Sequence, residues 1–254
     1  MISISSPVFS LLDFEVALAF VNQHFDGWEV VGECEHFLPE VEKRFHDATS
    51  CYDMSFSAHA PMSDINIGSL NPRIREVAVS ELIKGMEAAD RMGMDTYTFH
   101  PGFWSPIGPL ANERVREAMS GSLESVDRAA RNLNIKAAME NMPDLTFAMC
   151  KSPEELFQFL EGTEIGICFD IGHANVSGNL DRFLEHSSRY TNVHVHDNAG
   201  EMDDHLPIGD GVIDFTWVLN GLDGYSGKMV IEARSLNDAI KGKRKLLELI
   251  DSVS

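Results

Sequence analysis

The feature that most constrains the fold is an eightfold repetition of a short apolar or alternating run followed by a longer helical pattern. Each short run has the length and residue types of a buried strand. Strands that alternate with helices pair in parallel, and eight such units within 254 residues predict one closed (β/α)₈ barrel over residues 1–254. The runs begin at Ile2 (ISISS), Trp28 (WEVVGE), Asp53 (DMSFSAH), Asp95 (DTYTFH), Ile135 (IKAAMEN), Ile165 (IGICFD), Asn192 (NVHVHD) and Lys228 (KMVIEA).

The segments between these runs carry apolar residues at helical spacing, which supports the barrel. Pro153 followed by Glu154 and Glu155 is typical of a helix start. The shortest crossover helices are expected around residues 38–48 and 180–186. A doubly wound open sheet is the alternative, but no GxGxxG or GxxxxGK[ST] turn follows any predicted strand.

Composition excludes several classes of protein. The net charge of -20 argues against sequence-independent binding of nucleic acid, because such binding needs clustered Lys and Arg. No apolar run is long enough to span a bilayer, and the amino terminus lacks the basic segment of a signal peptide. The four cysteines show neither a CxxC pair nor a disulfide-framework spacing. We therefore expect a cytoplasmic enzyme or binding protein without a membrane partner, and homo-oligomerisation stays open.

The side chains that could do chemistry stand at the carboxyl ends of the predicted strands, the face that carries the active site in such barrels. The stretch 192–214, NVHVHDNAGEMDDHLPIGDGVID, shows this most clearly. Val193 and Val195 would face one way and His194 and His196 the other, before an acidic loop closed by glycines. Nine imidazoles and carboxylates occupy such positions: His59, His100, Glu140, Asp170, His173, His194, Asp203, His205 and Glu232.

These nine positions together predict a divalent metal site. A lone histidine at a strand end is more often a structural, hydrogen-bonded group, and a solvated polar loop is the alternative for 192–214. Glu140, Asp170 and Glu232, however, each close an apolar strand, where an unpaired carboxylate is costly to bury. Carboxylates that converge on one barrel mouth repel one another unless cations intervene. Mixed oxygen and nitrogen ligands suit Zn²⁺, Mn²⁺, Co²⁺ or Fe²⁺ better than Ca²⁺, with Zn²⁺ or Mn²⁺ preferred, and Cys168 is interpreted as a core residue.

The motifs HAP, FHPG, ENMP, FDIGHA, HVHD, DDHLPIGDG and IEAR resemble those of the xylose-isomerase-like TIM barrels, a superfamily that includes endonuclease IV. The resemblance runs from about Ser57 to Arg234. Endonuclease IV cleaves abasic sites with three zinc ions, and its likeness implies three ligand groups here, with Glu140 shared: His59, His100 and Glu140; Glu140, Asp170, His194 and Glu232; His173, Asp203 and His205. The sugar isomerase and epimerase branches imply one ion, held by the second group. One to three ions per chain are therefore expected.

The same set of nine candidate ligands is compatible with two mechanisms. In an isomerase or epimerase, the resemblance implies that Glu140 and Glu232 move protons between adjacent carbons through an enediolate, while His173 touches the sugar. In a phosphodiesterase, clustered metals generate hydroxide and stabilise the attacking and leaving oxygens. The complete set of nine favours the second mechanism, since an isomerase has no evident need for ligands such as His59 and His100.

Other residues favour a small substrate over duplex DNA. Ala60 and the residues after it stand where endonuclease IV has a tyrosine that helps to open the duplex, and the loops supply few cations. Phe103 and Trp104 offer an apolar lid for a small ligand, although ordinary loop packing explains them equally well. Arg234 could grip a phosphate through two hydrogen bonds or pair with a surface acid.

The sequence thus favours a metal-dependent isomerase or epimerase acting on a sugar or sugar phosphate, with an endonuclease IV-like phosphodiesterase as the alternative. Duplex DNA is the less favoured partner. A non-catalytic, metal-stabilised binding barrel is a third hypothesis. The pair Glu140 and Glu232 counts against it, because a purely structural metal site is normally closed by its ligands.

Overall fold

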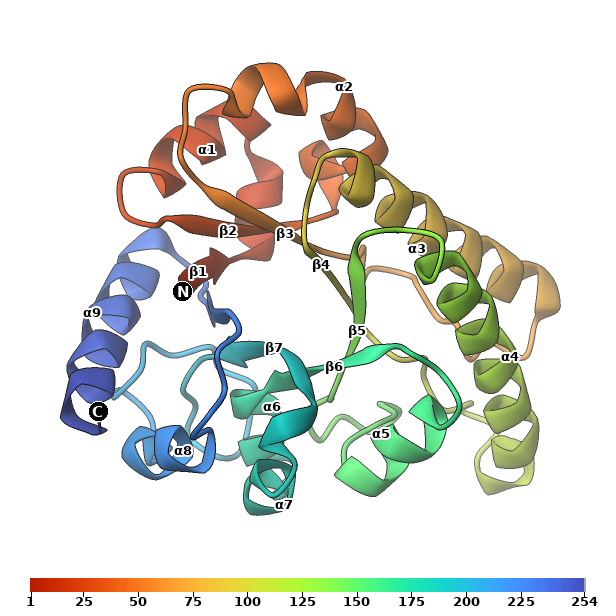
Figure 1. The fold of residues 1–254 in the computed structure, drawn as a ribbon. Helices are drawn as coiled ribbons and strands as arrows, with labels where there is room; N and C mark the ends of the chain where they lie inside the picture. The colour runs from red at the N-terminus through yellow and green to blue at the C-terminus, as the bar shows by residue number, and fades with distance from the viewer. Residues whose placement is uncertain (254) are drawn as a thin grey trace.

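The chain forms a closed parallel barrel in a computed structural model that describes residues 1–253. Neighbouring strands pair in the order β1-β2-β3-β4-β5-β6-β7-β8, and β8 closes on β1. Figure 1 shows the helices outside this ring of strands, with both ends of the chain on the same side of the barrel. The predicted (β/α)₈ architecture is confirmed. The strands are β1 (Ile2–Ser5), β2 (Gly27–Val31), β3 (Ser55–His59), β4 (Thr96–Phe99), β5 (Lys136–Glu140), β6 (Gly166–Asp170), β7 (Tyr190–Val195) and β8 (Met229–Glu232).

The crossover helices cover the outside of the strands. They are α1 (Phe14–Val21), α2 (Leu38–Thr49), α3 (Pro72–Arg91), α4 (Asn112–Ala130), α5 (Pro153–Leu160), α6 (Ile171–Val176), α7 (Leu180–Leu184), α8 (Phe215–Gly221) and α9 (Leu236–Val253). Short 3₁₀ turns lie at Pro7–Leu11, Cys34–His36, Pro109–Ala111 and Ser187–Arg189. Both crossovers expected around 38–48 and 180–186 contain a helix, α2 and α7. The expectation of a short helix is correct for α7, which has 5 residues, but wrong for α2, which with 12 residues is longer than α1 and α5. Among the helices within residues 1–253, none has the length and apolar character needed to cross a membrane.

Local sequence signals explain where two of the helices begin. The Ser152 side chain accepts a hydrogen bond from the amide of Glu155, and Pro153 occupies the first helical position of α5. At α6, the Asp170 carboxylate accepts a 2.6 Å hydrogen bond from the amide of His173. This cap turns the chain directly after β6 and brings His173 back over the end of the barrel.

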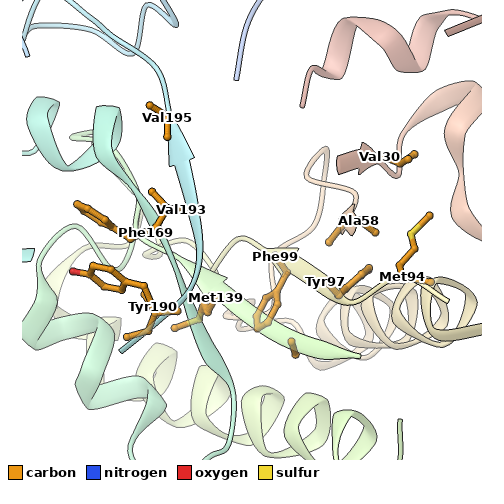
Figure 2. Packing of buried hydrophobic residues seen from close by; sticks show 14 of the residues in the cluster. Val30, Ala58, Met94, Tyr97, Phe99, Met139, Phe169, Tyr190, Val193 and Val195 are labelled. Atoms are coloured by element: carbon orange, nitrogen blue, oxygen red, sulfur yellow. The ribbon is translucent and has the colours of Figure 1, made fainter. Parts of the chain in front are cut away.

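The apolar core lies between the strands and the helices, because alternate strand residues point outward. Figure 2 shows Val193 on β7 beside Phe169, with Val195 farther along the strand. The rings of Phe169 and Tyr190 stack with centroids 4.6 Å apart. The intervening residues point into the barrel, so the predicted split between the valines and His194 is confirmed.

The interior below the mouth is polar. There the Glu29 carboxylate accepts hydrogen bonds from Ser57 Oγ (3.2 Å) and Asn192 Nδ2 (2.8 Å).

Candidate metal centre

The nine predicted residues lie together at the carboxyl ends of the strands and in the loops that follow. They form overlapping groups in which one donor atom of each residue lies within 4.8 Å of the others. A tenth residue, His196, joins one of these groups. The groups are His59, His100 and Glu140 (the outer group); Glu140, Asp170, His194 and Glu232 (the central group); and His173, His196, Asp203 and His205 (the loop group).

Glu140, at the end of β5, is the residue that connects the groups. Its Oε2 lies 3.2 Å from Nε2 of His59 and 3.3 Å from Nε2 of His100. Its Oε1 lies 3.3 Å from Nδ1 of both His173 and His194. Burial opposes ionisation of this carboxyl, but the imidazoles of His194, His100 and His59 together outweigh burial and hold the pKa of Glu140 well below its usual range. A bridging carboxylate therefore occupies the middle of the site.

The central group draws on four consecutive strands, β5 to β8. Nδ1 of His194 lies 3.2 Å from Oε1 of Glu232 and 3.9 Å from Oδ2 of Asp170. Burial opposes ionisation of Glu232 as well, yet the nearby His194 lowers its pKa to about 2. Three carboxylates thus converge on one imidazole nitrogen, which is a donor set that suits a divalent transition metal ion.

The imidazoles are oriented by partners on their far side. Nδ1 of His59 lies 2.8 Å from the carbonyl of Ala60, and Nδ1 of His173 lies 2.8 Å from the carbonyl of Asn141. Nε2 of His194 instead lies 2.8 Å from Oε1 of Glu29. In each case the ring donates from one nitrogen and leaves the other facing the carboxylates. This arrangement is the usual one around metal-binding histidines.

The sequence did not single out Glu29 or Asn141. The Asn141 side chain ties β5 to β6, since it donates to the Asp170 carbonyl at 2.9 Å and accepts from the Asp170 amide at 2.8 Å. Glu29 is fully buried inside the barrel. The signal that could have revealed it is a carboxylate inside the apolar run WEVV, where burial requires a partner.

The loop after β7 is held by Asp197, whose carboxylate accepts four backbone amides. Oδ1 accepts from Asn198 (2.9 Å) and Ile213 (3.2 Å), and Oδ2 accepts from Gly209 and Gly211 at 3.0 Å each. A side chain at position 211 would collide with the Asn198 carbonyl at 2.3 Å, which explains the glycine. Both carboxylate oxygens of Asp197 are therefore used to stabilise the loop that carries Asp203 and His205.

Arg234, for which the sequence left open a phosphate or a surface acid as partner, is hydrogen-bonded to this loop. Its guanidinium donates to the carbonyls of Asp203 and Asp204 at 3.0 Å each. His205 has a left-handed backbone (φ 51°), which is strained for a residue other than glycine. Its Nε2 lies 2.9 Å from Oδ2 of Asp203. Arg234 thus ties the loop group to the end of β8.

The two aromatic residues expected in a lid lie in the loop after β4. Phe103 pairs with Ala148 in an isolated antiparallel bridge, which joins this loop to the one after β5. Trp104 packs against the core, with the guanidinium of Arg116 4.9 Å from its ring centre. Contact of Phe103 and Trp104 with a substrate stays a prediction.

The donor set fits divalent metal ions. Among residues 1–253, five buried side-chain atoms of these groups have no hydrogen-bond partner: Glu140 Oε1, Asp170 Oδ2, His194 Nδ1, His196 Nε2 and Asp203 Oδ1. An unpaired polar atom in a protein interior costs about 1–3 kcal/mol, and more when it is charged. Cations between these atoms would remove that cost. Cys168 also lies near Glu140 and His194, but burial raises the pKa of its thiol well above the usual range, so it is a poor ligand.

Comparison with known proteins identifies the family. A model of the xylose isomerase-like TIM barrel family matches residues 18–253. The chain belongs to this family. A solved structure described as a D-tagatose 3-epimerase-like protein is similar to this xylose isomerase-like barrel with a TM-score of 0.93 and 31% identity, over 99% of this chain and 97% of that one. A protein from Thermus thermophilus, soaked with zinc chloride, is similar with a TM-score of 0.79 and 25% identity, over 99% and 98% of the two chains.

Two relatives in sequence add detail to this family membership. An uncharacterized protein of Methanocaldococcus jannaschii is 32% identical over 262 residues, which cover 99% of this chain and 89% of the relative. A probable endonuclease 4 of Oceanobacillus iheyensis is 29% identical over 177 residues, which cover 62% of this chain and 58% of the relative. This xylose isomerase-like barrel is thus similar both to a D-tagatose 3-epimerase-like protein and to a probable endonuclease 4.

Proposed function

We propose that this protein is a divalent-metal-dependent isomerase or epimerase that acts on a sugar or sugar phosphate. The observation that carries the proposal is the central group, in which Glu140 and Glu232 approach the same nitrogen of His194 from β5 and β8. One oxygen of each glutamate lies within 4.8 Å of the other. Both carboxylates are therefore within reach of one small substrate bound at this point.

Moving a hydrogen between adjacent carbons of an α-hydroxy carbonyl requires a base and an acid close to those carbons. A divalent ion held by the central group would supply Lewis-acid polarisation of the carbonyl, which makes the neighbouring C–H more acidic. One of the two glutamates, Glu140 or Glu232, takes the proton from the first carbon and, now a carboxylic acid, returns it to the neighbouring carbon, while the other glutamate carries the hydroxyl proton from one oxygen to the other. Both have lowered pKa values, so both are ionised at neutral pH and able to accept a proton. Asp170 and His194 hold the ion in place.

Access to the site also supports a small substrate. Most of the donor residues are buried, and exposure is concentrated at His100 (20%), His205 (19%) and Asp203 (25%). The solvent-accessible part of the site thus consists of two imidazoles and one carboxylate. With a net charge of -20, the chain repels a nucleic acid backbone more than it repels a sugar or a single phosphate. The likeness to a D-tagatose 3-epimerase-like protein over almost the whole chain supports the same substrate class.

Solvent hydrogen exchange tests this proposal. The protein is incubated in D₂O with a panel of ketoses and their phosphates, and deuterium at the carbons beside the carbonyl is followed by NMR. Metal-dependent exchange in at least one sugar is expected. If no sugar exchanges in protein loaded with Zn²⁺ or with Mn²⁺, the proposal is wrong.

Phosphodiester hydrolysis is the second candidate function, and the outer and loop groups favour it. An isomerase needs the central group alone, whereas His59, His100, Asp203 and His205 would hold further ions. The 29% identity to a probable endonuclease 4 supports this candidate, although that match covers only 62% of the chain. An oligonucleotide with an abasic site tests it directly. Nicking that is lost in Glu140→Gln would replace the isomerase proposal.

A further inference from the structure

His196 is the one member of the loop group that the sequence motifs did not assign to a metal. It follows the last residue of β7 and, like His194, points into the barrel; 1% of its surface is exposed. The imidazole ring of His196 packs directly against Gly172 on α6, where the absence of a side chain leaves room for it. A Cβ atom there would lie 2.0 Å from Cε1 of His196, which no real packing allows. Glycine at position 172 is therefore a requirement of this imidazole.

The inward-facing nitrogen of His196 has no hydrogen bond. Nδ1 of His196 lies 3.4 Å from the carbonyl oxygen of Asp197. Nε2 lies 3.2 Å from Oδ1 of Asp170 and 3.4 Å from Oδ1 of Asp203, and neither contact has hydrogen-bond geometry. Oδ1 of Asp203 has no hydrogen-bond partner among residues 1–253 either. Two buried atoms of opposite polarity thus face the same point without a bond between them.

The other imidazoles of the loop group surround the same carboxylate. Oδ2 of Asp203 lies 2.9 Å from Nε2 of His205 and 3.4 Å from Nε2 of His173. The rings of His196 and His205 stack, with centroids 4.0 Å apart and planes inclined by 12°. Donor atoms of all four residues lie within 4.8 Å of one another, whereas the ligands of a tetrahedral zinc ion lie about 3.3 Å apart, so binding of one ion would draw these side chains together.

We propose that His196 is a fourth protein ligand, so that His173, His196, Asp203 and His205 form a closed site for one divalent transition metal ion. Three imidazoles and one carboxylate match the preference of Zn²⁺ for four-coordinate nitrogen and oxygen ligands. A site closed by four side chains leaves no position for water or substrate, so its ion anchors the loop after β7. His173 then belongs to the anchor, and the chemistry is left to the central group.

This inference rests on the divalent ions of the proposed function, but not on the reaction itself. The alternative is a protonated His196 that pairs with the carboxylates of Asp170 and Asp203. The two differ in metal content. Replacing His196 removes an ion in the first case and leaves the ion count unchanged in the second.

The test compares four full-length proteins: wild type, His196→Phe, Gly172→Ala and His24→Phe. His196→Phe keeps a flat ring and removes the donor, and Gly172→Ala displaces the ring while keeping every ligand. His24 is exposed, so His24→Phe is the matched control. Each protein is stripped with a chelator, refilled with Zn²⁺ and desalted, and its ions are counted by mass spectrometry. A parallel Co²⁺ titration reports coordination, since four-coordinate Co²⁺ absorbs visible light far more strongly than six-coordinate Co²⁺.

Both site variants are expected to retain one ion fewer per chain than wild type, and to lose the intense part of the Co²⁺ spectrum. The ions that remain show that the variants fold. An unchanged ion count and spectrum in His196→Phe and Gly172→Ala would overturn the inference. One ion in wild type, retained in both variants, overturns the closed site but leaves the central group intact. Absence of bound ions from wild type overturns this inference together with metal dependence.

Discussion

The carboxylate of Glu29 on β2 lies 2.8 Å from Nε2 of His194 on β7, across the barrel interior and with both side chains fully buried. The contact fixes which nitrogen of His194 carries the hydrogen, and so presents Nδ1 to Glu140 and Glu232. A carboxylate behind an imidazole also increases its basicity as a ligand. Glu29 thus positions the central group without touching a substrate.

Glu29→Gln should weaken metal binding at the central group about 10-fold, because outer partners of metal-binding histidines contribute about 10–100-fold to affinity. Glutamine keeps the shape of the side chain and removes its charge. Chelator competition measures the dissociation constant, and Glu35→Gln, at an exposed position on the next turn, is the control. An affinity equal to that of wild type would show that Glu29 only fills space. His194→Ala should lose the central ion itself.

Glu232→Gln should lower the rate of deuterium exchange into a sugar substrate by about 10²- to 10⁴-fold, the usual range for loss of a general acid or base. Glu140, Asp170 and His194 remain to hold the ion, so the metal content should fall much less than the rate. Glu201→Gln, at an exposed position in the loop after β7, should exchange at the wild-type rate. Equal losses of metal and of exchange would make Glu232 a ligand without a role in proton transfer.

Asp197→Asn should destabilise the protein by about 2 kcal/mol, because the new amide group places donors against backbone N–H groups that need an acceptor. Four backbone amides depend on this carboxylate, including those of Gly209 and Gly211. Urea unfolding measures the change in free energy. Asp210→Asn, which loses an exposed ion pair with Lys241, should cost at most about 1 kcal/mol. If the two variants unfold alike, Asp197 does not hold the loop.

His36 should make stability depend on pH. It is buried between Phe14 and Trp28, and burial lowers the pKa of its imidazole from 6.5 to about 4. Between these pH values the unfolded chain binds the additional proton, so the contribution of His36 is complete above pH 6.5 and is lost as the pH falls toward 4. In the metal-free protein, His36→Phe should flatten the fall in unfolding free energy by up to about 1.4 kcal/mol per pH unit within this window.

The His36 measurement needs a control because the histidines of the metal centre titrate too. His24→Phe removes an exposed histidine and should preserve the wild-type slope. Both variants keep the histidines of the metal centre, so the contribution of these histidines to the pH dependence cancels when the slopes are compared. Equal slopes for wild type and His36→Phe would contradict a depressed pKa at His36.

The sequence by itself determined the barrel and the residues at its mouth. Alternation with period two in runs such as NVHVHD decides which residues face inward, and eight such runs leave a closed parallel barrel as the consistent solution. Carboxylates such as Glu140 and Asp170, each at the end of an apolar strand, then had to meet at one end of the barrel. Both conclusions rest on local periodicity, which the order of residues records directly.

Only the tertiary structure decided what each inward-facing residue contacts. His194 and His196 share one strand pattern, yet the first is backed by Glu29, 165 residues away in the chain, and the second occupies the space left by Gly172. Arg234 likewise donates hydrogen bonds to the backbone of the loop that carries Asp203. These contacts depend on distances across the barrel and on the path of its loops. Periodicity contains no information about either, because it describes one strand at a time.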